Sequence, residues 1–326
     1  LPSKFKDMKT YWMPILFILP TISSTSQTTP LPDPGARAME LVWFWPEATP
    51  GSIGRMEPFE IGFRIPASIE RNIEAYLKER PVPRALNPFD PEDIDITAYF
   101  QEVNKNPEII TPLETRYGFF YEEFSRNLTA ADPNDWHHEK HPTLFPIRVR
   151  YTPEKEGNYK CWAVMKTKDG DSFTTDTLSF KVNKSSNPGY VKVGKSKRFF
   201  VQDSSTFFPV GQNLPWPACH KLFDPLCEQI KCAGSESWCG NKTMGPYGYE
   251  VYHKEMAALK YSGANYFRML VAPWNLEIEF EKLNNYADRL NCAWEMDQIL
   301  KHAAELDLYI HFNLQVHYPW EAQSIY

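Results

Sequence analysis

The spacing of apolar residues changes at one short polar segment, residues 183–189, and this change is the strongest constraint on the fold. Before the segment, short apolar runs are separated by turn residues, and several of them alternate with a period of two, which is typical of β-strands. After it, strand-like runs alternate with stretches of helical periodicity. The sequence therefore predicts two folding units, residues 39–182 and 190–326, joined by a linker at 183–189.

The first unit is predicted to be an all-β sandwich of immunoglobulin-like architecture. Tyr159 stands two residues before Cys161 and follows a glycine turn, which is the pattern of a tyrosine corner. The strand around Ile61 contains no cysteine, so the inter-sheet disulfide of antibody domains is not expected. The predicted strands cover residues 41–45, 59–65, 94–100, 145–151, 158–166 and 172–182, and a short helix covers 67–78.

The second unit is predicted to be an α/β structure with parallel strands, because strands joined by amphipathic helices pair in parallel. A hairpin within residues 199–211 leads into a strand that we expect to be buried. Helices are expected at 249–262, with Gly263 as the stop signal, and at 286–306. Strands are expected at 265–271 and 308–316. The inner face of the second helix is predicted to carry Ala293, Met296, Leu300 and Ala303.

The amino-terminal residues have the pattern of a secretory signal peptide. A basic start is followed by an apolar stretch of about ten residues and a small polar exit, which is too short to span a bilayer. We expect the signal peptide within residues 1–26, a proline-rich linker at 27–38, and a secreted or cell-surface protein without a membrane span. The alternative is a buried amino-terminal strand. The formal net charge of −6 argues against nucleic acid as a partner.

Four of the six cysteines form one cysteine-rich insertion, residues 219–239. An oxidising compartment permits disulfides, and the spacing lacks the close cysteine pairs that zinc sites favour. We therefore expect two local disulfides rather than zinc, with all three pairings open. Cys161 and Cys292 are expected to be buried thiols, and the insertion is formed by Cys219, Cys227, Cys232 and Cys239.

The second unit resembles the opening of the (β/α)8 barrels of a glycoside hydrolase clan that includes cellulases, mannanases and β-galactosidases. The resemblance rests on the segments YVKV (190–193), RFF (198–200), FFPVGQN (207–213) and GANYFR (263–268). The first unit is similar to an immunoglobulin-like module of unknown function that precedes such barrels in secreted bacterial proteins. Together the two resemblances cover roughly residues 40–326.

The resemblance implies a TIM barrel of which this chain holds only the first part. Such a barrel needs about 250 residues, whereas 326 − 189 = 137 residues follow the linker, enough for about three βα units. In the clan, the acid/base and nucleophile glutamates follow strands four and seven, which implies positions beyond Tyr326. The chain is therefore expected to contain no catalytic carboxylate pair and to be inactive alone.

Polar residues just after each predicted strand are the candidate substrate-binding or supporting residues, because active sites of this fold lie at the carboxyl ends of the strands. The resemblance implies that Arg268 keeps the nucleophile ionised by charge-assisted hydrogen bonds. It also implies that His317 bonds sugar hydroxyls, although a histidine satisfied within a loop is an equal alternative. The other polar candidates are Asn213 and Asn313.

Three tryptophans, Trp216, Trp274 and Trp320, also follow strand ends. An indole face can stack on the C–H face of a sugar while its polar neighbours bond the hydroxyls. Each could equally be core packing, but their recurrence at three successive strand ends favours carbohydrate binding.

Two other charged runs are given structural interpretations. The histidines within 137–141 lie between prolines, and adjacent side chains point apart on a regular backbone, so we expect an exposed loop rather than a metal site. The solvent-exposed face of an extended segment is expected to carry Glu277, Glu279 and Glu281. No metal and no cofactor are expected.

The leading hypothesis is a secreted glycoside hydrolase acting on poly- or oligosaccharide. The first alternative is a non-catalytic carbohydrate-binding or adhesive cell-surface protein. A structural role in a cell-envelope assembly is the second alternative.

Overall fold

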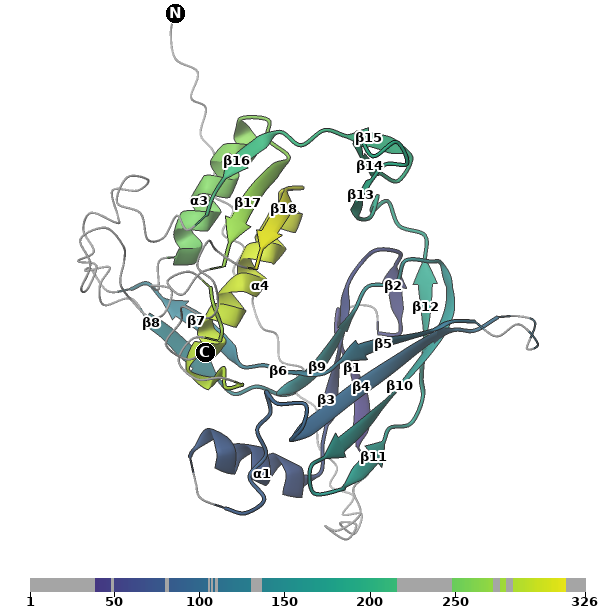
Figure 1. The fold of residues 1–326 in the computed structure, drawn as a ribbon, viewed down its shortest axis with the longest axis vertical. Helices are drawn as coiled ribbons and strands as arrows, with labels where there is room; N and C mark the ends of the chain where they lie inside the picture. The colour runs from purple at the N-terminus through teal and green to yellow at the C-terminus, as the bar shows by residue number, and fades with distance from the viewer. Residues whose placement is uncertain are drawn as a thin grey trace, which may run out of the picture. The chain divides into compact units, whose positions relative to one another are not determined.

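The structure is a computed structural model that describes residues 39–47, 50–79, 82–104, 106, 108, 111–129, 137–215, 248–271, 276–279 and 284–314. These residues are mostly β-structure, arranged in five sheets with three α-helices and one 3₁₀ turn (Figure 1). None of these sheets closes into a barrel within the described ranges.

Two sheets make up what we call the two-sheet region, residues 39–183. The first has the order β1–β3–β9–β6, and all of its neighbours are antiparallel. Its strands are β1 (Glu40–Trp45), β3 (Phe59–Arg64), β9 (Ile147–Tyr151) and β6 (Phe119–Phe120).

The second sheet has the order β2–β12–β10–β4–β5, and β11 pairs with β10 at one end. The β12–β2 pair is parallel and the other pairs are antiparallel. Its strands are β2 (Ser52–Gly54), β12 (Leu178–Asn183), β10 (Gly157–Thr167), β4 (Ile94–Glu102), β5 (Leu113–Tyr117) and β11 (Ser172–Thr174).

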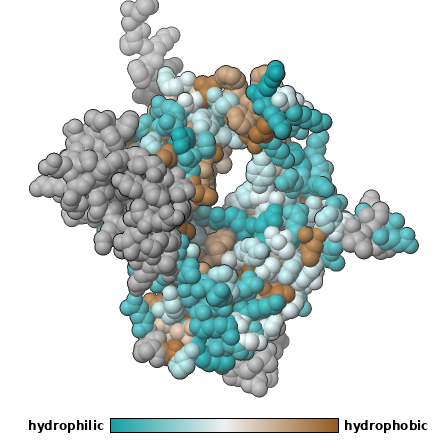
Figure 2. Space-filling view, in the orientation of Figure 1, coloured by the Kyte–Doolittle hydropathy of each residue, from teal (hydrophilic) through white to brown (hydrophobic). Residues whose placement is uncertain are grey.

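The two sheets share one hydrophobic core. In β4 and β10, buried residues alternate with more exposed ones, as expected when one face of a sheet packs and the other meets water. Phe59 lies fully buried among the rings of Trp43, Tyr151 and Phe180. Figure 2 shows mainly hydrophilic residues on the visible outer surface of this region.

The predicted tyrosine corner is present. The Tyr159 hydroxyl donates a hydrogen bond to the Lys155 carbonyl oxygen at 3.1 Å, and the ring is buried. Cys161 is also buried, as predicted, and forms no disulfide. Helix α1 (Ala67–Leu77) confirms the predicted short helix and buries Ile69 and Ile73 against the core.

Two smaller sheets are formed by other segments of the chain. Strands β7 (Glu123–Asn127) and β8 (His137–His141) form an antiparallel pair, which we call the β7–β8 hairpin. The expectation of a loop at 137–141 is therefore wrong, because these residues pair with β7 as a strand. All of them except His138 are exposed, as expected. Strands β13 (Val191–Val193), β14 (Phe200–Gln202) and β15 (Ser205–Phe207) form an antiparallel three-stranded sheet.

The last sheet is parallel and has the order β16–β17–β18. Its strands are β16 (Gly211–Asn213), β17 (Tyr266–Leu270) and β18 (Tyr309–Asn313), and we call it the parallel sheet. Helix α3 (Gly248–Tyr261) lies between β16 and β17 in the chain, whereas the 3₁₀ turn η3 (Ala287–Arg289) and helix α4 (Leu290–Glu305) lie between β17 and β18 (Figure 1). The predicted parallel pairing is confirmed, but β16 is exposed rather than buried.

Helix α3 ends as predicted, since Gly263 adopts φ 84°, a left-handed conformation that costs glycine little. The predicted inner face of α4 is only partly right. Cys292, Ile299 and Ala303 are buried, but Leu300 is 40% exposed. The buried face also includes Glu295, because α4 packs against the β7–β8 hairpin as well as against the parallel sheet.

Candidate functional site

The two faces of the parallel sheet differ in character. Phe267 and Met269 of β17, with Ile310 and Phe312 of β18, belong to or pack against the core formed with α3 and α4. Because successive strand residues point to opposite faces, the intervening residues lie on the face away from the helices. This second face, which we call the polar face, carries Tyr266, Arg268, Tyr309, His311 and Asn313.

Arg268 and Asn313 meet at the carboxyl-terminal end of the polar face. The Arg268 Nε donates a hydrogen bond to the Asn313 Oδ1 at 3.3 Å, and both side chains are partly buried. Asn213, the last residue of β16, pairs in register with Arg268 and is exposed. The structure therefore places Asn213, Arg268 and Asn313 at one end of the sheet.

The approach of β16 to β17 explains why a glycine stands in the Gly-x-Asn segment. A Cβ on Gly211 would lie 1.7 Å from the backbone oxygen of Tyr266, a distance that no side chain can tolerate. Glycine therefore permits the pairing that holds Asn213 opposite Arg268.

Sequence reasoning missed the second polar pair on this face. The Tyr266 hydroxyl lies 3.2 Å from the His311 Nδ1, and His311 is opposite Arg268 in the register of β17 and β18. His311 is exposed. The signal was present in the sequence, since alternation along β18 puts His311 on the same face as Asn313.

The remaining predicted site residues lie outside the described residues. This holds for the tryptophans, for the candidate histidine and for the four clustered cysteines. They are Trp216, Trp274, His317, Trp320, Cys219, Cys227, Cys232 and Cys239.

The polar face offers hydrogen-bonding groups of several kinds. A guanidinium donates, amides donate and accept, and a phenol and an imidazole can do both, a set that suits a polyhydroxylated or anionic ligand. None of the residues that the structure describes on this face is a carboxylate, and no set of three or more potential metal ligands occurs among the described residues. The site as described can bind and orient a ligand.

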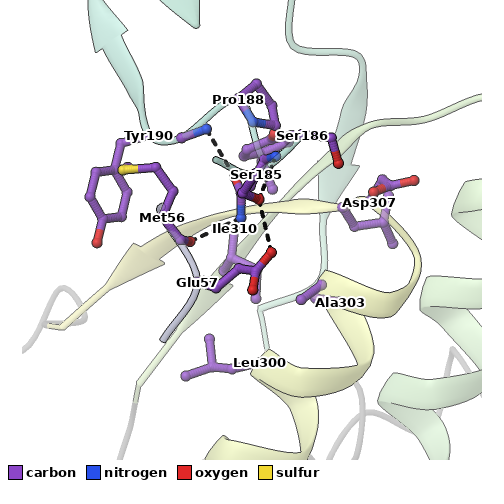
Figure 3. Close-up of a pocket in the computed structure, with 15 residues that line it drawn as sticks. Met56, Glu57, Ser185, Ser186, Pro188, Tyr190, Leu300, Ala303, Asp307 and Ile310 are labelled. Carbon is purple, nitrogen blue, oxygen red and sulfur yellow. Dashed lines mark hydrogen bonds between the residues drawn. The ribbon is translucent and has the colours of Figure 1, made fainter. Parts of the chain in front are cut away.

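A cavity of about 510 Å³ lies at the opposite end of β18 (Figure 3). Tyr309 and Ile310, the first residues of β18, line it together with Leu300 and Asp307, whereas Asn313 ends the strand. In Figure 3 the Ser185 hydroxyl donates to a Glu57 carboxylate oxygen at 2.8 Å. The cavity is therefore separate from the polar groups at the carboxyl end.

Two expectations about charged residues are corrected. Glu277 was expected on a wet face, but it is 5% exposed and follows the fully buried Leu276. The backbone oxygen of Glu277 accepts a hydrogen bond from the Arg289 Nη1 at 3.4 Å, and Arg289 is itself buried. His138 was expected in an exposed loop, but its side chain is 9% exposed and bonds Glu295.

Among the helices that the structure describes, none combines the length and the apolar character needed to cross a membrane. The sequence matches no protein-family model, and no curated protein matches it.

The solved structures that match this chain include two that we describe here. One is described as "a putative glycoside hydrolase from Bacteroides vulgatus" and aligns with a TM-score of 0.45 and 16% identity over 80% of this chain. The alignment spans 40% of that protein's length. The other is the soluble domain of PmoD from Methylocystis, with a TM-score of 0.20 and 11% identity over 44% of this chain and 90% of that domain.

Proposed function

We propose that the chain is part of a secreted glycoside hydrolase that acts on poly- or oligosaccharide. In this proposal an immunoglobulin-like sandwich at 39–182 precedes the opening strands of a (β/α)8 barrel at 190–326, with linkers at 27–38 and 183–189. The parallel order β16–β17–β18 with intervening helices is the arrangement that begins such a barrel.

The observation that carries the proposal is the gathering of Asn213, Arg268 and Asn313 at the carboxyl end of three parallel strands. In barrels of this type the strands' carboxyl ends build the active site. The proposed role of Arg268 in the whole barrel is to hold a carboxylate ionised. In this chain its guanidinium, with the two asparagines, would bond sugar hydroxyls. Trp216, Trp274, Trp320 and His317 complete the proposed sugar surface, and the catalytic carboxylates are assigned to later strands of the barrel.

The alternative is a non-catalytic carbohydrate-binding or adhesive surface protein. The two functions share the same binding site and differ in whether bonds are broken.

Binding of carbohydrate by the whole chain tests the shared part of both functions. We expect retardation in native gels that contain a soluble polysaccharide, screened over a panel of plant and bacterial glycans. Arg268→Gln should weaken binding roughly tenfold to a hundredfold, since a charged hydrogen bond contributes about 1.5–3 kcal/mol. The matched control is Arg64→Gln, because Arg64 is 61% exposed in the two-sheet region and its ion pair contributes little.

Failure of the folded chain to bind any glycan in the panel would overturn the proposal, as would equal binding by the Arg268→Gln and Arg64→Gln variants. Release of reducing ends distinguishes hydrolase from binding protein. We expect this chain to bind without releasing them, and release would contradict the assignment of the catalytic carboxylates to later strands.

We also propose that the protein is exported, on the basis of the signal-peptide pattern in residues 1–26. Expression in a secreting host should yield a mature protein that begins near Gln27. Intracellular retention with an intact amino terminus, measured by mass spectrometry, would contradict export.

A further inference from the structure

The β7–β8 hairpin and helix α4 bury a carboxylate between them. Glu295 of α4 is fully buried, and its Oε1 lies 2.8 Å from the His138 Nε2 of β8. The same oxygen lies 3.5 Å from the Arg126 Nε of β7. Among the described residues the other oxygen, Oε2, has no hydrogen-bond partner. A buried carboxylate with one unsatisfied oxygen is costly when it carries a full negative charge.

Every element packed around Glu295 contributes a group that bears on its charge. Arg126 also donates from Nη1 to the Glu250 Oε1 of helix α3 at 2.8 Å, so its positive charge is shared between two carboxylates. From α4, the Asn291 Nδ2 lies 3.5 Å from the His138 Nδ1. The ring of Trp294 contacts the other side of the imidazole, with centroids 6.1 Å apart.

The charge balance of this cluster depends on one proton. Counted over these described residues alone, Glu250 and Glu295 carry two negative charges against the positive charge of Arg126, which leaves −1 when His138 is neutral. One added proton on the His138–Glu295 pair brings the cluster to zero. Because the pair is buried, that difference matters more than it would in water.

A second contact between α4 and the two-sheet region, the Arg150–Asp297 ion pair, does not depend on this proton. Arg150 of β9 donates from Nη1 and Nη2 to the two oxygens of Asp297 at 2.9 and 2.8 Å. Arg150 also donates from Nε to Glu60 at 2.6 Å. A guanidinium keeps its charge throughout the physiological range, so this bidentate pair is constant between mildly acidic and mildly alkaline pH.

We propose that docking of the β7–β8 hairpin on helices α3 and α4 takes up one proton at the His138–Glu295 pair, so that this contact tightens as the pH falls and loosens as the pH rises. The hairpin and α4 thereby form a pH-responsive latch, and the Arg150–Asp297 pair is its fixed anchor. The inference stands independently of the proposed function.

The direction of the pKa shift of Glu295 agrees with this proposal. Burial raises the pKa of Glu295 above its usual range, against the opposing effects of the His138 hydrogen bond and the Arg126 charge. A carboxyl group whose pKa is higher in the docked state favours docking below the undocked pKa, and this contribution is lost as the pH rises through the docked value. Release of the hairpin returns both side chains to water and releases the proton.

Hydrogen exchange of the full chain at a series of pH values tests the latch. Protection factors, corrected for intrinsic exchange rates, are measured for peptides that cover 123–127 and 137–141, with β10 as the internal reference. Because a proton on the pair favours docking, we expect the protection of the hairpin relative to β10 to be greater at pH 5 than at pH 8.

Two variants separate the latch from general effects of pH. Glu295→Gln keeps the size of the side chain but removes the buried carboxyl group, and should leave hairpin protection the same at both pH values. Glu305→Gln is the matched control, because the Glu305 side chain is 57% exposed on the same helix, and it should behave as the wild type.

Equal hairpin protection in the wild type at pH 5 and pH 8 would overturn the proposal. So would a pH dependence that survives in the Glu295→Gln variant. The wild-type series decides the question even if that variant fails to fold. Asp297→Asn should lower protection by a similar factor at every pH, and a pH-dependent loss in this variant would contradict the assignment of a fixed anchor.

Discussion

Replacement of Phe59 by alanine should remove a large part of the stability of the two-sheet region. The ring is 0% exposed and stacks on Trp43 with centroids 4.4 Å apart and planes 10° from parallel. It also meets Phe180 at 5.0 Å and Tyr151 at 5.8 Å, both edge-on. Truncation of a buried phenylalanine typically costs about 3–5 kcal/mol, and each lost aromatic pair contributes about 0.5–1.5 kcal/mol of coupling. We therefore expect a loss near the upper end, about 4–5 kcal/mol.

Equilibrium unfolding in urea, followed by near-ultraviolet circular dichroism, measures this loss as a lower midpoint at an unchanged slope. Phe199→Ala is the matched control, because Phe199 is 60% exposed and its replacement should change the unfolding free energy by less than about 0.5 kcal/mol. A loss below about 1 kcal/mol for Phe59→Ala would refute the reasoning, since it would mean that the ring is not closely packed in solution.

Three further predictions concern single positions. Gly211→Ala should separate β16 from β17 and lower the free energy of unfolding by about 1–3 kcal/mol, because the new methyl group would collide with the Tyr266 backbone oxygen. Unchanged stability would contradict the close approach of the two strands. Burial raises the pKa of the Cys161 thiol to about 12, so alkylation at pH 8, followed by mass spectrometry, should require unfolding, and rapid labelling of the native chain would count against burial. Burial, with smaller effects of Glu102 and Glu114, raises the pKa of Tyr159 to about 12. The stability that this neutral phenol contributes is complete below about pH 10 and lost as the pH rises toward 12, so Tyr159→Phe should flatten that part of the stability curve.

The sequence periodicity correctly predicted those strands and helices that pack one face against a single core. Strands β4 and β10 alternate cleanly because one face packs on the core and the other meets water. Helix α3 was predicted equally well, because Tyr252, Met256 and Leu259 face a single core. The burial of Leu300 in helix α4 was predicted wrongly, because α4 packs against both the parallel sheet and the β7–β8 hairpin. The local sequence pattern does not show which element the second partner is.

The β7–β8 hairpin was missed for a related physical reason. Its histidines look like a solvated loop, and the one that is buried, His138, contacts Glu295, which stands 157 residues later in the chain. At the polar face, the family resemblance pointed to Arg268 and the strand end to Asn313, and the two side chains do lie together. His311 was overlooked because it lies two residues before the strand end, although its position in the alternation was visible.

Helix α4 has a consequence for the order of events during protein synthesis. Its residues Glu295 and Asp297 meet partners that precede them by 157 and 147 residues. At about 5–20 residues per second, the ribosome produces those partners roughly 7–30 s before the helix, ample time for strands to form. The two-sheet region and the β7–β8 hairpin can thus serve as a folding template for α4, because Arg150 and His138 are already present as partners for Asp297 and Glu295. A circular permutant that synthesises α4 first would expose the helix's acidic residues without them, and should fold more slowly.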